Sequence, residues 1–366
     1  MSTLKIRSNS MLGTSHSWSV TMRSLLEAFA EQGHDLYLNS INDYELVPKS
    51  WDKFIKKECI DADIDICYTL PRNFGLRFNA NSKLKLAIYN YETSIMPSVW
   101  VPQIKKVDYV LPSSSFSKKV FVDSGWPAEK CVVVPHGINL KDFDNKEKVN
   151  NLRTNRKFKF LNISIPHYRK NIGLLVSAYY KAFTAEEDVC LVIKTSLDPP
   201  SKSKRFECDV TKEIQKVQKS SENRKRPLPQ LELLSYKYDN IIPLYNTCDC
   251  LVSASSAEGF GLPLLEALAA GLIVVAPRCT GQLDFLNDKN SLLVNANEIK
   301  ASPKYQYWHP SPGAKTFLPE VDSLAENMRK VYDDYNELKT LFEDERSKTI
   351  NKFTWTNAAN KILELV

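Results

Sequence analysis

The sequence predicts an α/β protein of two domains, each built on an open parallel sheet. The chain has 366 residues, which is long for a single hydrophobic core and suits two domains of about 150–200 residues each. A strand, a glycine-containing loop, a helix and a second strand follow one another at the N-terminus and again at 249–276. This unit is the repeating piece of a parallel sheet.

Composition points to a globular protein in a reducing compartment. Apolar residues make up 43% and charged residues 25% of the chain, as in ordinary water-soluble domains. No apolar run approaches the ~18 residues of a membrane span, and the first residues lack the features of a signal peptide. Eight scattered cysteines, many within apolar runs, predict buried free thiols. We therefore expect a cytoplasmic protein.

The first half of the chain alternates strands with helices. Apolar residues between 20 and 29 recur at helical spacing, directly after a polar loop at 8–19. Strands are predicted at 4–6, 33–38, 64–70, 84–89 and 107–112, and a further helix at 116–124. The charged run at 141–157 has few large apolar residues and is typical of a linker.

The second half repeats the alternation. Strands are predicted at 158–165, 189–195, 249–255, 272–276 and 284–294, and helices at 172–183, from 264 to Gly271, at 321–342 and after Trp355. Residues 301–320 are expected to form an irregular loop. The segment 201–226 is rich in lysine and arginine. It reads either as a solvated insertion or as a basic face for an anionic acceptor.

The loop at 258–262, Glu-Gly-Phe-Gly-Leu, carries the strongest functional signal. Its glycines let a ligand approach the main chain closely, and Pro263 suits the first turn of the following helix. Free amides at a helix N-terminus attract phosphates and hydroxyls. Glu258 and Glu266 should both lie at the carboxyl edge of the sheet. Carboxylates there can bind the paired hydroxyls of a ribose or a hexose.

Glu258-x7-Glu266, within EGFGLPLLEALAAG, resembles the signature of the retaining GT-B glycosyltransferases of family 4. The preceding LYNTCDCLVSAS resembles the lead-in of that family, and the likeness is most specific from about 131 to 295. The resemblance implies a GT-B fold, with two Rossmann-like domains facing each other across a cleft. It places an acceptor-side domain at 1–142, a nucleotide-sugar domain at 143–350, and a helix at 351–366 that packs back towards the first.

The resemblance also implies roles for residues of the second domain. Glu258 is expected to contact the donor sugar and Glu266 the ribose. Gly259, Phe260, Gly261 and Leu262 are expected to bind the donor through the loop. Lys170 matches the family lysine that contacts the diphosphate. The second cation of the family usually stands where this chain has Ser164, so Arg169 either substitutes for it or points outward. Two cations at a helix N-terminus would stabilise a departing diphosphate.

Candidates in the first domain rest on weaker likeness. Gly13 and Thr14, in the first loop, are expected near the donor's phosphates, although the family often has two adjacent glycines there. Many relatives have a histidine where this chain has Asn90 or Glu92, which makes these two candidates for the acceptor side. Glu92 could equally cap the following helix. His136, in the hinge-like Pro135-His136-Gly137, is expected to form a wall of the cleft.

The resemblance implies a retaining, metal-independent hexosyl- or pentosyltransferase. It would move a sugar from a nucleotide-diphosphate-sugar to a glycan or lipid-linked acceptor, without a cofactor. The acidic run at 61–65 precedes an apolar strand and reads as a turn, not as a metal site. The alternatives are a transferase that modifies DNA bases through 201–226, an epimerase or phosphorylase on the same scaffold, and a non-catalytic nucleotide-sugar-binding protein. The net charge of +6 is compatible with a phosphorylated donor, an anionic acceptor, nucleic acid or peripheral contact with a membrane.

Overall fold

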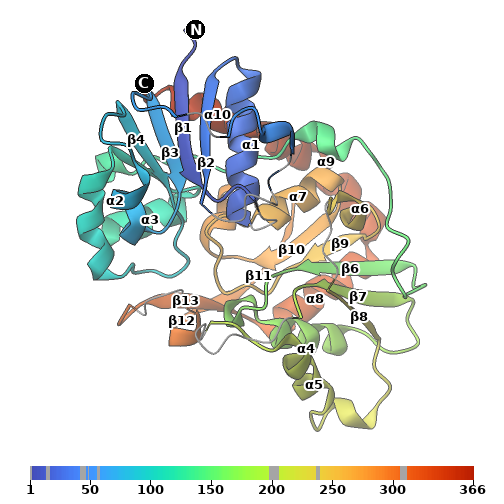
Figure 1. Ribbon diagram of the computed structural model, residues 1–366. Helices are drawn as coiled ribbons and strands as arrows, with labels where there is room; N and C mark the ends of the chain where they lie inside the picture. The colour runs from blue at the N-terminus through green and yellow to red at the C-terminus, as the bar shows by residue number, and fades with distance from the viewer. Residues whose placement is uncertain are drawn as a thin grey trace. The chain divides into compact units, whose positions relative to one another are not determined.

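The computed structural model describes residues 2–13, 17–41, 47, 49–55, 58–197, 206–235, 240–305 and 311–366. The chain divides into two compact units, each with its own parallel sheet (Figure 1). The first unit comprises residues 1–91, 95–139 and 352–366. The second comprises residues 92–94 and 140–351.

The first unit is a five-stranded parallel sheet in the order β2-β1-β3-β4-β5. Its strands are β1 (Lys5–Ser10), β2 (Asp35–Ser40), β3 (Ile64–Tyr68), β4 (Leu84–Ile88) and β5 (Tyr109–Leu111). Its α-helices are α1 (Ser17–Glu31), α2 (Phe74–Arg77), α3 (Ser115–Asp123) and α10 (Trp355–Leu363), and the 3₁₀ segment η4 covers Ser98–Lys106. Every residue of β3 is buried, as expected where a parallel sheet is covered on both faces.

The second unit is a six-stranded parallel sheet in the order β11-β10-β9-β6-β7-β8. Its strands are β6 (Phe158–Ile163), β7 (Val189–Lys194), β8 (Gln230–Leu234), β9 (Cys250–Val252), β10 (Ile273–Pro277) and β11 (Leu292–Val294). Its α-helices are α4 (Ile172–Ala182), α5 (Val210–Gln218), α6 (Ile242–Tyr245), α7 (Leu262–Ala270), α8 (Val321–Asp333) and α9 (Tyr335–Lys352).

The strand order of the second unit creates a switch point. Connections run to one side from β6 through β7 to β8, and to the other side from β9 through β10 to β11. The neighbours β6 and β9 pair in register through Phe160 with Cys250 and Leu161 with Leu251. The carboxyl ends of these two strands therefore lie side by side, and the loops that follow them diverge. In open α/β sheets this is where ligands bind.

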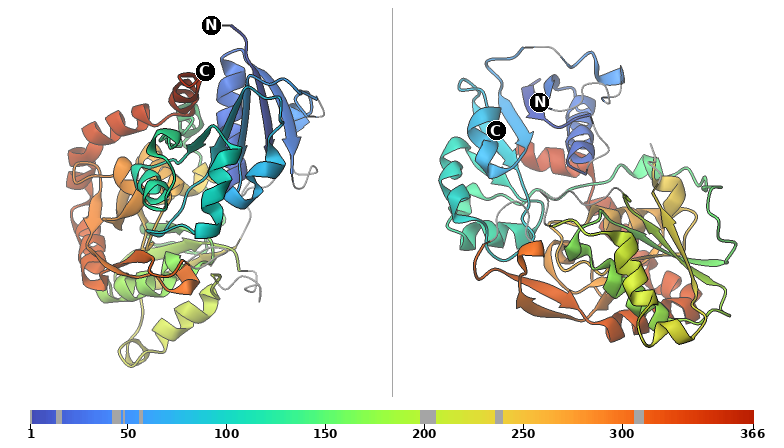
Figure 2. Two further views of the ribbon diagram at one scale, coloured as in Figure 1. Left: turned by 90° about the vertical axis from the view of Figure 1, so that its left-hand side faces the viewer. Right: turned by 60° about the horizontal axis from the view of Figure 1, so that its bottom comes forward.

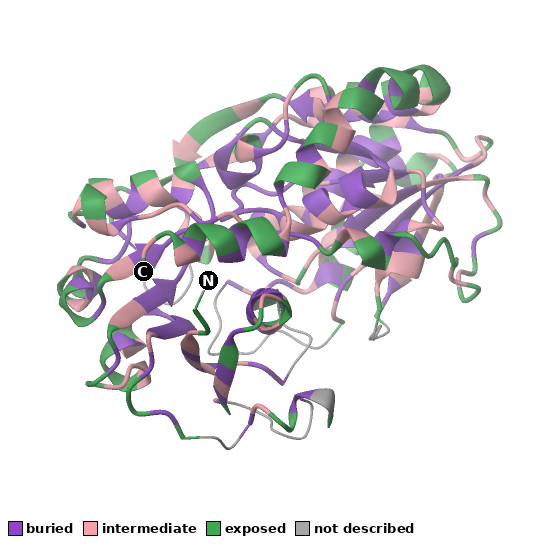
Figure 3. Ribbon diagram, turned by 90° about the horizontal axis from the view of Figure 1, so that it is seen from above, coloured by how far each residue is buried: buried purple, intermediate pink, exposed green. Residues whose placement is uncertain are grey.

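The core of each unit lies between its sheet and its helices. In Figure 3 the strands are mostly buried and the helices carry exposed residues along one side. In α4 the buried residues include Leu175, Val176 and Tyr179, which pack against strand residues such as Phe160 and Leu191. All eight cysteines are buried free thiols, which confirms that part of the prediction.

The polar loop predicted at 8–19 is shorter in the structure, since β1 runs to Ser10 and α1 starts at Ser17. Three further predictions differ from the structure. The prediction of a single helix at 321–342 is wrong, since α8 ends at Asp333 and a separate helix, α9, starts at Tyr335. Asp334 is neither glycine nor proline, so the sequence carries no marker of this break. The strand at 284–294 shrinks to β11, because Asn287 and Asn290 hydrogen-bond neighbouring backbone groups and form a turn.

The third difference is a hairpin within the predicted loop at 301–320. Strand β13 (Lys315–Pro319) pairs antiparallel with β12 (Ala296–Lys300), outside the six-stranded sheet (Figure 2). Both strands are partly exposed and mixed in composition, so they lack the apolar runs that predicted the other strands.

Within 201–226, the described residues 206–226 are not simply solvated. Helix α5 buries Val210 and Ile214 in the core of the second unit. Among the residues that the structure describes, no helix combines the length and the apolar character needed to cross a bilayer.

Gly137 fixes how the C-terminal segment packs within the first unit. Ile138 accepts a backbone hydrogen bond from Trp355 and donates one to Phe353. A methyl group on Gly137 would stand 2.2 Å from the main chain of Thr354 and Trp355. This close approach requires a residue without a β-carbon.

We expect Gly137→Ala to lower the free energy of unfolding by about 1–3 kcal/mol, because backbone on both sides of the contact must shift. Urea unfolding measures the effect. Gly75→Ala is the matched control, since its nearest neighbour is the flexible end of Lys106 at 3.8 Å. Equal stabilities of the two variants would contradict the assignment.

Candidate functional site

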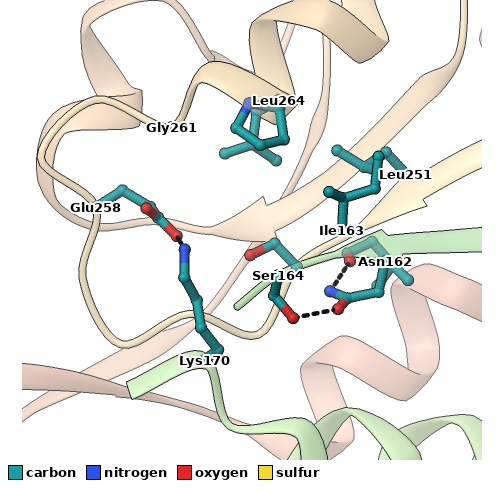
Figure 4. A pocket seen from close by; sticks show the side chains of 11 residues that line it. Asn162, Ile163, Ser164, Lys170, Leu251, Glu258, Gly261 and Leu264 are labelled. Carbon is teal, nitrogen blue, oxygen red and sulfur yellow. Dashed lines mark hydrogen bonds and ion pairs between the residues drawn. The ribbon is translucent and has the colours of Figure 1, made fainter. Parts of the chain in front are cut away.

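A pocket opens in the second unit at the switch point between β6 and β9 (Figure 4). Residues 162–164 at the end of β6 and 251–253 at the end of β9 line it on one side. Lys170, Glu258 and the start of α7 complete the lining. The pocket thus lies where the strand order predicts a ligand site.

The floor of the pocket is a short chain of hydrogen bonds. The amide Nδ2 of Asn162 donates to the carbonyl of Val252 at 2.8 Å and so joins β6 to β9 beyond their ladder. The hydroxyl of Ser164 donates to Oδ1 of Asn162, also at 2.8 Å. Asn162 is buried and Ser164 half-buried, so the second is the polar group that a ligand can reach.

The turn between β6 and α4 carries two adjacent cationic residues, Arg169 and Lys170. It is a 3₁₀ turn, η7 (Tyr168–Lys170), that ends at Asn171 in the left-handed conformation, with φ of 50°. Asparagine tolerates this conformation better than most residues. The Asn171 side chain donates to Ala254 O at 2.9 Å and to Ser256 Oγ at 2.7 Å. The turn is therefore tied to the loop that follows β9.

Lys170 and Glu258 form an ion pair at the pocket, and their side chains point toward one another in Figure 4. Each side chain is only 12% exposed. Burial acts to raise the pKa of Glu258, but the charges of Lys170 and Arg169 overcome it and lower that pKa to about 2. Burial and the neighbouring Arg169 lower the pKa of Lys170. Glu258 is thus an ionised carboxylate in the lining of the pocket.

Arg169 points inward, so the alternative that it faces outward does not hold. Its side chain is 7% exposed. The guanidinium donates to the carbonyl of Ala257 at 2.6 Å and to Glu258 at 3.4 Å. Its other terminal nitrogen donates to Glu92, which belongs to the second unit, at 3.3 Å. Arg169 as a substitute for the second diphosphate cation stays a prediction.

The main chain of Glu258 is fixed from a third loop. Its N–H donates to Thr280 Oγ1 at 2.9 Å, and its carbonyl accepts from the N–H of Gly281 at 3.0 Å. A β-carbon on Gly281 would stand 2.3 Å from the carbonyl oxygen of Gly259. The sequence prediction missed Thr280 and Gly281. The signal for them was a Thr-Gly pair directly after the strand β10.

Helix α7 places Glu266. Gly261 precedes the helix with φ of 96°, and Pro263 lies in its first turn as predicted. Glu266 is half-buried and accepts a hydrogen bond from the Tyr245 hydroxyl at 2.6 Å. Burial raises the pKa of Glu266 to about 7, although the bond from Tyr245 lowers it. Tyr245 is a further residue that sequence reasoning missed, within the lead-in segment.

The other candidate residues of the 258–262 loop differ in how far they are buried. Phe260 is buried with its ring centroid 5.0 Å from that of Phe285, so it anchors the loop. Gly261 lines the pocket, and Leu262 is half-buried at the start of α7. Gly259 lies between Glu258 and Phe260, against Gly281. Their contacts with a donor stay predictions.

The candidates of the first unit lie in different surroundings. Gly13 is buried just after β1, and Thr14 lies outside the described residues. Asn90 is engaged within the unit, since its amide donates to Tyr68 and accepts from Ser113. His136 is buried between the rings of Tyr68 and Trp355, and burial lowers its pKa to about 3. It is therefore a neutral imidazole near pH 7.

Glu92 does not cap a helix in the described structure. The following helical segment η4 has Pro97 as its N-terminal cap residue. The Glu92 carboxylate instead faces Arg169, and burial raises its pKa.

The acidic run at 61–65 is structural. Asp61 pairs with Lys5, Asp63 with Lys83, and Asp65 with Arg7. Among the described residues, no group of three or more His, Cys, Asp and Glu side chains could hold a metal ion.

A polar, cation-bearing pocket at the switch point of a parallel sheet is the place where α/β proteins of this class bind their ligands. Residues 143–305 match the family model described as "Glycosyl transferases group 1". This match confirms the resemblance noted in the sequence. No curated protein is similar enough in sequence to count as a match.

Solved structures support the GT-B fold of the whole chain. A glycosyltransferase from Rickettsia africae ESF-5 is 17% identical, with a TM-score of 0.71 over 100% of this chain and 98% of its own. HepE from Anabaena, solved in complex with UDP and glucose, is 16% identical, with a TM-score of 0.68 over 99% of both chains. A sucrose-phosphate synthase from Thermosynechococcus elongatus is 16% identical, with a TM-score of 0.67 over 99% of this chain and 98% of its own.

Glu266 makes stability depend on pH. The unfolded chain ionises this carboxyl near its ordinary pKa of 4.5, whereas the folded protein keeps the proton until about pH 7. The free energy of unfolding therefore falls as pH rises through this window, by as much as roughly 3 kcal/mol. We expect Glu266→Gln to remove this fall.

Urea unfolding at pH 5 and pH 8 measures the difference between the wild type and the variant. Glu326→Gln, an exposed glutamate of α8, is the control and should keep the wild-type pH dependence. If Glu266→Gln behaves like this control, Glu266 is not the buried acid described above.

Proposed function

We propose that this protein is a retaining, metal-independent glycosyltransferase that takes its sugar from a nucleotide-diphosphate-sugar. The observation that carries the proposal is the buried Lys170–Glu258 pair in the switch-point pocket, beside the glycine-led N-terminus of α7. A cation, a helix N-terminus and an ionised carboxylate at one pocket match the parts of such a donor. The family match of residues 143–305 supports the same reaction class.

Each part of the donor has a candidate partner in the second unit. The diphosphate would lie against Lys170 and near the N-terminus of α7, where the helix dipole favours negative charge and Gly261 leaves room for a ligand to approach. The ribose hydroxyls would bind Glu266. The sugar hydroxyls would bind Glu258, with Gly259, Phe260 and Leu262 shaping the loop around it.

The chemistry follows from these positions. The bond between the anomeric carbon and the diphosphate oxygen breaks, and its electron pair leaves with the diphosphate. The acceptor hydroxyl oxygen forms the new bond on the same face of the sugar and gives its proton to the departing diphosphate oxygen. Positive charge from Lys170 and the positive end of the α7 dipole stabilise the negative charge that grows on the leaving group. Glu258 orients the ring whose anomeric carbon becomes positively charged.

The acceptor is proposed to be a glycan or a lipid-linked sugar, presented by the first unit, where Asn90 and His136 are candidates. Glu92, although it belongs to the second unit, is a further acceptor-side candidate, and Gly13 and Thr14 are proposed to approach the donor's phosphates. Eight buried thiols support a reducing compartment such as the cytoplasm. Transfer to DNA through the basic segment remains the alternative.

The choice of probe comes from the relatives. HepE from Anabaena was solved with UDP-glucose, so UDP is the first nucleotide to test. Thermal-shift and calorimetric titration with UDP, GDP and ADP should identify one that binds the wild-type protein. A protein that binds none of the three is not the transferase proposed.

We expect Glu266→Ala to weaken binding of the best of these nucleotides by roughly 1–3 kcal/mol, because ribose hydroxyls lose a hydrogen-bond partner. Lys170→Ala should lower donor turnover by about 10²–10³, measured as sugar released from the matching nucleotide-sugar. Exposed Lys181→Ala on α4 is the control for a lost lysine. Wild-type affinity in Glu266→Ala, or wild-type turnover in Lys170→Ala, would remove the residue from its assigned role.

A further inference from the structure

The two adjacent cations of η7 are held in different ways. Lys170 lines the pocket, and among the described residues its ammonium pairs with Glu258. Arg169 is not part of the lining. Its guanidinium is packed behind the carboxylate, against the loop at 255–258. Two neighbouring positive charges thus meet the same carboxylate from different sides.

Arg169 is fixed by its main chain and its side chain together. Its carbonyl accepts from the N–H of Ser256 at 2.8 Å, while its guanidinium donates to the Ala257 carbonyl at 2.6 Å. The other end of the guanidinium donates to Glu92. To reach a ligand in the pocket, Arg169 would have to give up its bond to the Ala257 carbonyl and leave the partly buried Glu92 carboxylate without its cation, which is costly.

Lys170 has no comparable anchor beyond Glu258. Its ammonium is a compact charge on a flexible stem, and its described partner is a single carboxylate. A nucleotide diphosphate brings at least two negative charges and several strong acceptor oxygens. In the same pocket it is a better partner for this ammonium than one carboxylate is.

Glu258 can stay in place when Lys170 leaves it. Thr280 and Gly281 hold its main chain, and Arg169 stays within reach of its carboxylate at 3.4 Å. The carboxylate oxygen that faces Lys170 is then released, while the group as a whole remains ionised and oriented.

We propose that the two cations divide the work: Lys170 exchanges Glu258 for the donor's diphosphate, whereas Arg169 remains bound to Glu258 as its positioning residue. The inference rests on the proposed function and deepens it. Arrival of the diphosphate frees one oxygen of Glu258, which then accepts from a sugar hydroxyl. The site therefore acquires its sugar-binding acceptor only once the diphosphate is seated.

The exchange makes a counterintuitive prediction for Glu258→Gln. Binding of the nucleotide alone, with UDP as the first probe, should become tighter by roughly fivefold or more, because the diphosphate no longer competes with a carboxylate for Lys170. Lys170→Gln should weaken the same binding by roughly tenfold or more. Arg169→Gln should change it by less than about threefold, since Arg169 does not touch the diphosphate.

Isothermal titration calorimetry on the four proteins measures these affinities, with GDP or ADP in place of UDP if the wild type prefers it. Arg169→Lys keeps the charge and guards against misfolding of Arg169→Gln. It should also stay within about threefold of the wild type. Glu326→Gln is the control for a lost glutamate, because this exposed residue of α8 lies outside the pocket lining, and it should leave nucleotide affinity unchanged.

The outcomes separate the inference from the proposed function. Loss of affinity in Arg169→Gln and Arg169→Lys as large as in Lys170→Gln would show that both cations bind the diphosphate, and would overturn the division. Unchanged or weaker binding in Glu258→Gln would overturn the exchange. Failure of the wild type to bind any of the three nucleotides would instead refute the proposed function.

Discussion

The charge cluster of Lys170, Arg169 and Glu258 is the interaction on which the site depends. Charges buried to this extent are costly unless each has a partner, and these three satisfy one another together with Glu92. The cluster forms only if the turn after β6 meets the loop after β9. That meeting is a direct consequence of the strand order, which makes these two strands neighbours with diverging connections.

Side chains elsewhere in the second unit fix the turn after β6 and the loop after β9 in position. Asn162, Asn171 and Thr280 each join two loops or strands by side-chain hydrogen bonds, so the pocket wall is braced from three directions. Gly281 lets a third loop approach without a gap. Within this rigid frame the flexible ammonium of Lys170 is the group best able to change partners. The pocket wall is thus held in position before a ligand binds, while the Lys170 ammonium can still exchange one partner for another.

Much of the fold and part of the site could be predicted from the sequence, because their signals are local. Strands such as β7 and β10 are uninterrupted apolar runs, and α7 is marked by Gly261, Pro263 and Gly271 at its ends. The two glutamates eight positions apart stand out because loop, proline and helix surround them. The weakly apolar hairpin of β12 and β13 and the break at Asp334 lacked such markers, and the sequence analysis missed both.

By itself, the sequence determined the alternation of strands and helices and the presence of an acid-and-glycine loop before α7. Those features depend on neighbours within a few residues of one another. Only the tertiary structure decided that Arg169 turns inward, that Tyr245 holds Glu266 and that Thr280 holds Glu258. Each of these contacts joins residues about 20 to 90 positions apart. Local periodicity carries no information about such pairs, because they are set by which strands become neighbours in the sheet.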